Sequence, residues 1–385
     1  MFTRRIHPVS DSIRGYSSMT VFTSVRGVAA TIGAVAALAA AAFGGAQQAA
    51  ATASTASATH VVATRAAVPA LSTTKTAHPG FRAAFWSPYF IDGSNDAAQI
   101  ATAMAAQKAA GDTDVIIEWS VHYDAGDAAY PAAVSLGFPQ WNSAVPQLVA
   151  AAKKAGMTVW LGLAVAPDSV SDMSKFADQS WLSSFARTQE RIADDLYAKY
   201  GSSVAGWYIP TEPAQVNVAT STRASRFGTY LGAVSDYLHA HDGRKPVMVS
   251  PSMPTAISAG LSAQQFVSEL APLISASHVD VLDLQDGYEM TAWTPAQEAA
   301  AFTAAKKLTD AARMQLWASV YTPLTDGNGA VPVTKMEPYL TAIGAIGVPL
   351  TEWEFTAYMD PDTTVAGGSA MTANYAAYTS YLGVK

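Results

Sequence analysis

The sequence predicts an α/β fold, a (β/α)8 TIM barrel that forms a single domain after an N-terminal export signal. From residue 80 onward, short apolar runs alternate with stretches of helical length, which is typical of parallel strands joined by crossover helices. The runs are continuously apolar, so the strands are expected to be buried on both faces. Eight such units in about 300 residues match the size of this barrel. An open, doubly wound sheet is the alternative, but residues 86–94, the first strand-to-helix turn, lack a G-x-G-x-x-G pattern.

The apolar runs and the helical stretches between them place each unit along the chain. The expected strands cover residues 81–86, 114–119, 158–163, 204–209, 246–250, 280–284, 315–320 and 349–355. The expected helices cover residues 97–110, 145–155, 182–200, 223–240, 263–274, 296–312, 335–346 and 370–382.

The N-terminal part of the chain differs in composition from the rest. Four arginines and no glutamate precede an apolar, Ala-rich stretch at 28–43, which is the layout of a secretory signal. The Arg4-Arg5 pair is compatible with twin-arginine export, and a retained membrane anchor is the alternative. We expect an export segment at 1–50, an Ala/Ser/Thr-rich disordered linker at 51–78 and the barrel at 79–385.

Composition narrows the classes of function. The 385 residues carry a formal net charge of −7 and only 14% are charged, so no nucleic-acid partner is expected. The absence of cysteine excludes disulfides, thiolate metal sites and a cysteine nucleophile. No H-E-x-x-H, P-loop or G-x-S-x-G pattern occurs. We expect no cofactor, no metal ion, no stable membrane insertion of the mature protein, and a monomer.

Carboxylates lie near the carboxyl ends of the expected strands, where the active sites of such barrels are found. Glycosidases need two carboxyl groups that flank the bond to be broken, one as acid and one as nucleophile or base. We expect Glu212, after the fourth strand, to act with one partner carboxylate. The structural alternatives are ion pairs, buried hydrogen-bond networks and, for Asp286, a simple turn. The candidate partners, in falling order, are Glu354, Glu352, Asp286 and Glu118.

The eighth strand contributes two of these candidates. Side chains alternate along a strand, so Glu352 and Glu354 should point the same way, which would let both face the barrel interior. One of them is then expected to function, and the other to pair with Arg82 or a lysine.

Aromatic side chains accompany the carboxylates, and flat apolar rings suit the stacking of sugar rings. Most of the 9 Trp, 16 Tyr and 13 Phe residues are expected to be core instead, with one or two tryptophans as sugar platforms. The expected substrate-binding residues are Trp86, Trp119, Tyr208, Gln285, Tyr321 and Trp353.

Three motifs carry a family resemblance: Gly206-Trp-Tyr-Ile-Pro-Thr-Glu212, Val281-Leu-Asp-Leu-Gln-Asp-Gly287 and Glu354-Phe-Thr-Ala-Tyr-Met-Asp-Pro361. With them the chain resembles a bacterial family of uncharacterised TIM-barrel proteins related to glycosidases, from about residue 80 to the end. The resemblance implies that Glu212 matches the strand-four acid/base of the largest glycosidase clan. That clan has its nucleophile, a glutamate, at the end of strand seven, but residues 316–321 contain none.

The residues and the resemblance together favour a secreted glycoside hydrolase that acts on a poly- or oligosaccharide. A non-catalytic carbohydrate-binding barrel at the cell surface is the first alternative, because the strand-seven glutamate is missing. An exported barrel with an ester or lipid substrate is the second, and it rests only on the versatility of the fold.

Overall fold

The computed structural model describes residues 78–91, 97–165, 175–253, 260–286, 293–324, 329–362 and 371–384. All of them lie within one compact unit, Arg65–Lys385. The predicted export segment and all but the last residue of the predicted linker lie outside the described residues, so their assignments stay predictions. In the described part of the chain, no helix combines the length and apolar character that crossing a membrane requires.

Eight parallel strands close into a barrel, which confirms the predicted fold class. Each strand pairs with the one that precedes it in the barrel sequence, and the last pairs with the first, so the ring closes without an edge. The barrel strands are β1 (Phe81–Trp86), β2 (Asp114–Ile117), β5 (Thr158–Gly162), β7 (Gly206–Ile209), β8 (Val247–Val249), β9 (Val281–Gln285), β10 (Gln315–Tyr321) and β11 (Leu350–Trp353).

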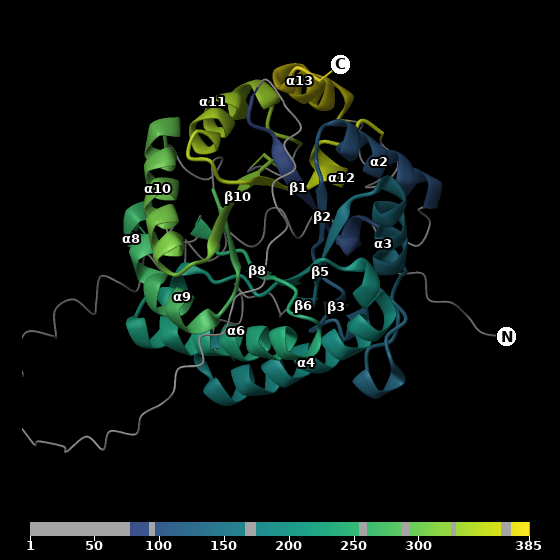
Figure 1. Ribbon diagram of the computed structural model, residues 1–385, viewed down its shortest axis with the longest axis vertical. Coiled ribbons are helices and arrows are strands. Elements are labelled where there is room, and N and C mark those ends of the chain that lie inside the picture. The colour runs from purple at the N-terminus through teal and green to yellow at the C-terminus, as the bar shows by residue number, and fades with distance from the viewer. Residues whose placement is uncertain are drawn as a thin grey trace, which may run out of the picture. The chain divides into compact units, whose positions relative to one another are not determined.

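Helices surround the strands on the outside of this ring (Figure 1). The expected helix at 263–274 is instead two short helices that meet at Leu270, because Pro272 cannot continue the hydrogen bonding of the first one. The longer helices are α2 (Ala97–Ala109), α3 (Ala144–Ala155), α4 (Gln179–Tyr200), α6 (Ser221–His241), α8 (Ala263–Glu269), α9 (Ala271–Ser277), α10 (Pro295–Ala311), α11 (Val333–Gly344) and α13 (Thr372–Leu382).

Smaller elements lie in the connections that leave the carboxyl ends of the strands, except for one 3-10 turn that precedes β7. A second sheet of three very short strands, in the order β4-β3-β6, joins the connections after β2 and β5. Sequence periodicity did not predict it, because strands of two residues carry no periodic signal. These elements are β3 (Val121–His122), β4 (Asp127–Ala128), β6 (Ala164–Val165), α5 (Gln215–Val218), α12 (Phe355–Tyr358) and the 3-10 turns η2 (Pro88–Phe90), η3 (Val134–Leu136), η4 (Lys175–Ala177) and η5 (Gly201–Ser203).

The barrel interior is filled by side chains from its strands, and a larger core lies between the strands and the helices. Bulky rings occupy the interior, with Trp160 and Trp317 edge to face at 5.3 Å between ring centroids. Gly206 makes room for this packing, since a Cβ at that position would overlap the Trp160 ring. The interior side chains are Ala83, Phe85, Ile116, Trp160, Tyr208, Met248, Val281 and Trp317.

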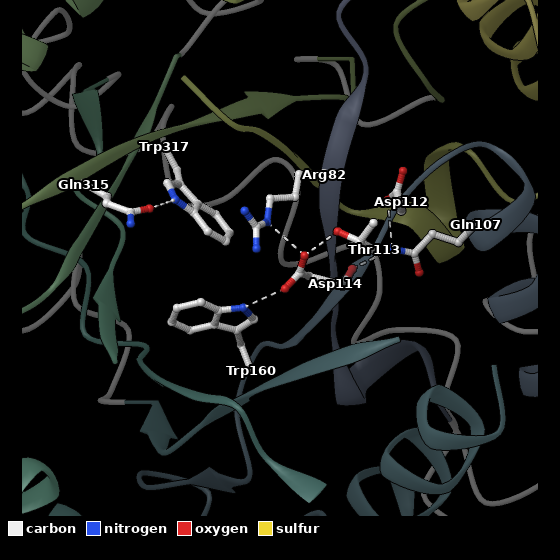
Figure 2. A network of polar contacts seen from close by, with 8 residues as sticks. All are labelled: Arg82, Gln107, Asp112, Thr113, Asp114, Trp160, Gln315 and Trp317. Atoms are coloured by element: carbon white, nitrogen blue, oxygen red, sulfur yellow. Dashed lines mark hydrogen bonds and ion pairs between the residues drawn. The ribbon is translucent and has the colours of Figure 1, made fainter. Parts of the chain in front are cut away.

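A buried ion pair lies at the amino ends of the first two strands (Figure 2). The Arg82 Nε donates to Asp114 Oδ2 at 2.9 Å, and the guanidinium lies 4.7 Å from the centroid of the Trp317 ring. The indole of Trp160 donates to the other oxygen of Asp114 at 3.2 Å. Arg82 is therefore engaged with Asp114 at the floor of the barrel.

Candidate functional site

Five of the eleven predicted site residues gather at the mouth of the barrel, at or just beyond the carboxyl ends of their strands. All five are partly exposed. Because the carboxyl ends of parallel strands share one end of a barrel, residues that lie far apart in sequence meet there. The five are Glu118 after β2, Glu212 after β7, Gln285 of β9, Tyr321 of β10 and Trp353 of β11.

Glu212 follows β7 in a Pro-Thr-Glu-Pro segment between the strand and α5. Burial raises the pKa of its carboxyl group to about 7, and the negative charge of Glu118 acts in the same direction. Hydrogen bonds from Gln285 and Tyr208 partly oppose this rise. A carboxyl group with this pKa carries its proton in a large fraction of molecules at neutral pH, as a general acid requires.

Glu118 lies next to Gly162 of the neighbouring strand, where a Cβ would overlap the Glu118 carbonyl group. The Trp353 indole donates to Glu118 Oε1 at 3.1 Å. Burial raises the pKa of Glu118, whereas the hydrogen bonds from Ser87 and Trp353 lower it by stabilising the ionised form. Glu118 and Glu212 are thus two carboxyl groups close enough for the charge of one to affect the pKa of the other, and they have different hydrogen-bond partners.

An aromatic wall stands beside the two carboxyl groups. The rings of Tyr321 and Trp353 are stacked, with centroids 5.8 Å apart and an interplanar angle of 3°. Burial raises the pKa of Tyr321 to about 12, with contributions from Asp286 and Glu212. Tyr208, which is buried, lies deeper, and its hydroxyl group bonds to Glu212. Tyr208 therefore positions a carboxyl group and is too deep to contact a substrate ring.

Asp283 of β9 adds a third carboxyl group below the mouth. It faces the interior, is fully buried and accepts a hydrogen bond from the Thr351 hydroxyl group, whose oxygen lies 3.0 Å from each carboxyl oxygen. Burial raises the pKa of Asp283 to about 7, and the Glu212 charge contributes to the rise. The sequence could have identified this residue, because Asp283 and Gln285 are two positions apart on one strand and so face the same way.

Glu352 does not reach the mouth, contrary to the predicted shared direction with Glu354. Thr351 and Trp353 of β11 face the barrel interior, so Glu352 between them faces the surrounding helices. It is buried there, and burial together with the charges of Asp112 and Glu354 raises its pKa well above the ordinary value. Its carboxyl group belongs to the layer between strands and helices.

Glu354 is also unsuited to contact a substrate, because it is fully buried and serves as the N-cap of α12. Its carboxylate accepts the Ala357 backbone N–H at 2.7 Å and the Thr356 hydroxyl group at 2.6 Å. Burial raises its pKa to about 8. Glu354 lies beyond the end of β11, where strand alternation no longer sets the direction of a side chain.

Asp286 follows β9 and is fully buried. Its Oδ1 accepts the Tyr321 backbone N–H at 3.0 Å, and its charge raises the pKa of Glu298 on α10. The structure thus directs Asp286 toward a helix outside the barrel, where it supports the end of β10.

Trp86 and Trp119 are both buried and cannot serve as sugar platforms themselves. Trp86 faces the helices, donates to Gln107 Oε1 at 2.8 Å and stacks on Phe355. Trp119 lies under two exposed rings, Tyr89 and Trp141, which sequence reasoning missed. Trp141 was overlooked because it lies outside every apolar run.

The arrangement at the mouth provides one carboxyl group that can donate a proton to a substrate and a second that can carry a negative charge beside it. Two partly exposed carboxyl groups, an amide at Gln285 and an aromatic wall are the components of a site for a polar ring-shaped substrate. In the described ranges, no three His, Asp or Glu side chains are arranged to hold a metal ion.

Comparison with known proteins places this architecture in a family. The family described as "Domain of unknown function (DUF4434)" matches residues 85–364. No curated protein matches the chain.

Solved structures share the fold at low sequence identity. A protein of Bacteroides thetaiotaomicron, provisionally described as an alpha-L-fucosidase, has a TM-score of 0.64 at 20% identity, covering 83% of this chain and 100% of its own. The PgaB (BpsB) glycoside hydrolase domain of Bordetella bronchiseptica has a TM-score of 0.51 at 11% identity, covering 80% and 100%. A protein described as an endoglucanase has a TM-score of 0.50 at 13% identity, covering 78% and 96%. The chain thus shares its barrel fold with these proteins.

Proposed function

Because this chain belongs to the DUF4434 family and has a glycosidase-like barrel, we propose that it is an exported glycoside hydrolase acting on a poly- or oligosaccharide. The observation that carries the proposal is the pair formed by Glu118 and Glu212. These are partly exposed residues at the barrel mouth, whose carboxyl groups have pKa values raised by burial and tuned by different partners.

Glu212 is the general acid of this proposal. Its raised pKa keeps a proton available at neutral pH, and the hydroxyl of Tyr208 and the amide of Gln285 hold the carboxyl group in place. The proton moves to the glycosidic oxygen as the bond from that oxygen to the anomeric carbon breaks. The leaving sugar therefore departs as a neutral alcohol.

Glu118 is the second carboxylate. Two donors, the Trp353 indole and Ser87, stabilise its ionised form, so it can hold negative charge near the positive charge that develops on the anomeric carbon. A water molecule then adds its oxygen to that carbon and gives up a proton to a carboxylate, which completes the hydrolysis. The structure supports Glu118 over Glu352 and Glu354, which the sequence ranked higher, because Glu352 is buried toward the helices and Glu354 is fully buried as the N-cap of α12. Tyr321 occupies the end of β10, the strand that carries the nucleophile in the largest glycosidase clan.

The substrate class follows from the aromatic wall and from the low charge of the chain. Stacked rings of Tyr321 and Trp353 suit the apolar face of a sugar ring. Export rests on the basic and then apolar N-terminal sequence, and the appearance of a shortened chain in culture medium tests it.

The test is a screen of the purified full-length chain for new reducing ends. Suitable probes are p-nitrophenyl α-L-fucoside and a soluble glucan, which cover the activities named for two structural neighbours, together with bacterial exopolysaccharides. Glu212→Gln and Glu118→Gln should each reduce kcat by about 10²- to 10⁴-fold. Glu352→Gln is the matched control and should retain activity, because that carboxyl group faces the helices.

Two outcomes would reject parts of the proposal. Hydrolysis that survives in Glu212→Gln removes Glu212 as the acid. Binding of a polysaccharide with no release of reducing ends would instead identify a carbohydrate-binding barrel without catalysis.

A further inference from the structure

A cluster of rings lies on the rim of the barrel next to Glu118, outside the pair of carboxyl groups. We call Tyr89, Trp119, His122 and Trp141 the rim aromatic cluster. Tyr89 is in η2, directly after β1, and Trp119 follows Glu118 after β2. The rings lie close together, with centroid distances of 4.9 Å for Tyr89–Trp119, 6.1 Å for Trp119–Trp141 and 5.5 Å for Tyr89–His122.

The exposure of this cluster is unusual for the chain. Four large hydrophobic side chains are exposed among the described residues, and two of them, Tyr89 at 39% and Trp141 at 45%, belong to the cluster. The other two, Val134 and Tyr197, lie elsewhere on η3 and α4. Two exposed rings at one place, contiguous with the candidate site, indicate a surface for binding.

The cluster is held rigidly before any ligand arrives. The Trp141 ring stacks nearly parallel on buried Trp119, with an interplanar angle of 16°, and its backbone N–H donates to the Ala128 carbonyl at 2.7 Å. The Asn142 side chain donates to the carbonyls of Pro88 and Ile91 at 3.2 and 2.9 Å. This amide ties the Trp141 segment to the turn that carries Tyr89, so little side-chain entropy is lost on binding.

We infer that the rim aromatic cluster is a glycan subsite, in which Trp141 and Tyr89 stack against a sugar unit of a chain whose neighbouring unit lies at Glu118. This inference rests on the proposed function. Ser87 joins the two places, because it bonds to Glu118 and lies two residues before Tyr89. The substrate is accordingly a glycan of several units.

Binding to polysaccharide in a native gel tests the subsite without requiring turnover. The full-length chain is run through gels that contain a soluble 1,4-β-glucan or a bacterial exopolysaccharide, and retardation against polysaccharide concentration gives Kd. Trp141→Ala should raise Kd about tenfold, and Trp141→Tyr should restore most of the affinity. Tyr197→Ala is the matched control, because it removes an equally exposed ring on α4, and should leave Kd unchanged.

Each other outcome overturns the inference. Retardation that is equal in the wild type and Trp141→Ala would show that the rim does not bind the glycan. If no polysaccharide in the gels retards the wild type, the inference that the rim binds a glycan is also rejected. A change of oligomeric state in Trp141→Ala, measured by gel filtration, would assign the rings to an interface between copies. The proposed hydrolase activity is judged separately, from reducing ends released by the wild type and not by Glu212→Gln.

Discussion

Replacing Asp114 with asparagine should destabilise the barrel strongly, although the two side chains have nearly the same shape. The substitution leaves the Arg82 guanidinium, which is 8% exposed, without its anionic partner at 2.9 Å. Removing one member of a buried ion pair costs about 3–5 kcal/mol. The Trp317 ring, 4.7 Å from the guanidinium, offsets about 1 kcal/mol of this. The free energy of unfolding should therefore fall by about 3 kcal/mol.

Asparagine also disturbs the other contacts of this position. Asp114 accepts hydrogen bonds from Thr113 at 2.6 Å and from the Trp160 indole at 3.2 Å (Figure 2). An amide offers one acceptor oxygen, and its NH2 group would face a donor, so one of these bonds is lost as well. The loss of this hydrogen bond offsets the stabilisation of the guanidinium by Trp317. The free energy of unfolding should therefore still fall by at least about 3 kcal/mol.

The assay is urea unfolding followed by circular dichroism and by tryptophan fluorescence. Asp310→Asn is the control, because Asp310 forms an exposed pair with Lys306 at 2.8 Å, and its loss should change stability by less than about 1 kcal/mol. The corresponding fall in Tm for Asp114→Asn is about 6–12 °C. A loss no larger than that of Asp310→Asn would refute the role assigned to the buried pair.

Hydrolytic activity should fall above about pH 7, because burial raises the pKa of Glu212 to about 7 and a general acid works only while protonated. A kcat/KM profile that is flat from about pH 6 to 8 would contradict this prediction. Trp353→Phe removes a donor that lowers the pKa of Glu118. The acidic limb of the kcat/KM profile should therefore move to higher pH by about one unit. An acidic limb that does not move would argue against Glu118 as the ionised group. Stability should decline as pH rises, because the pKa values of Asp283 and Glu354 are raised to about 7 and about 8 in the fold. The stability that these two carboxyl groups contribute is complete below their unfolded pKa of about 4, and it is lost as the pH rises through their pKa values in the fold. Tm should therefore fall between about pH 4 and 8. Glu354→Gln should make this fall in Tm smaller.

The architecture was predictable because it depends on local patterns. Each barrel strand is a continuous apolar run, and each run overlaps a strand of the structure, with β1 matching the predicted residues 81–86 at both ends. Helix boundaries follow the same logic except at Pro272, where the missing N–H group of proline divides the expected helix in two. The three-stranded sheet could not be foreseen, because its strands of two residues carry no periodic signal.

The candidate site was only partly predictable. Glu212, Glu118, Gln285, Tyr321 and Trp353 were all identified from their places at strand ends, and the structure brings them together. Their ranking was not predictable, because it depends on which face of each strand points inward. A sequence period of two shows which residues share a face but not which face is the interior.

Sequence alone determined that eight apolar strands alternate with helices, and that carboxyl groups and rings stand at the carboxyl ends of those strands. Only the tertiary structure decided that Thr351 faces Asp283 inside the barrel, which turns Glu352 outward, and that Glu354 caps a helix. The physical reason is that burial and charge act through space. The pKa of Glu212 depends on Glu118, a residue 94 positions earlier in the chain, and no local pattern contains that distance.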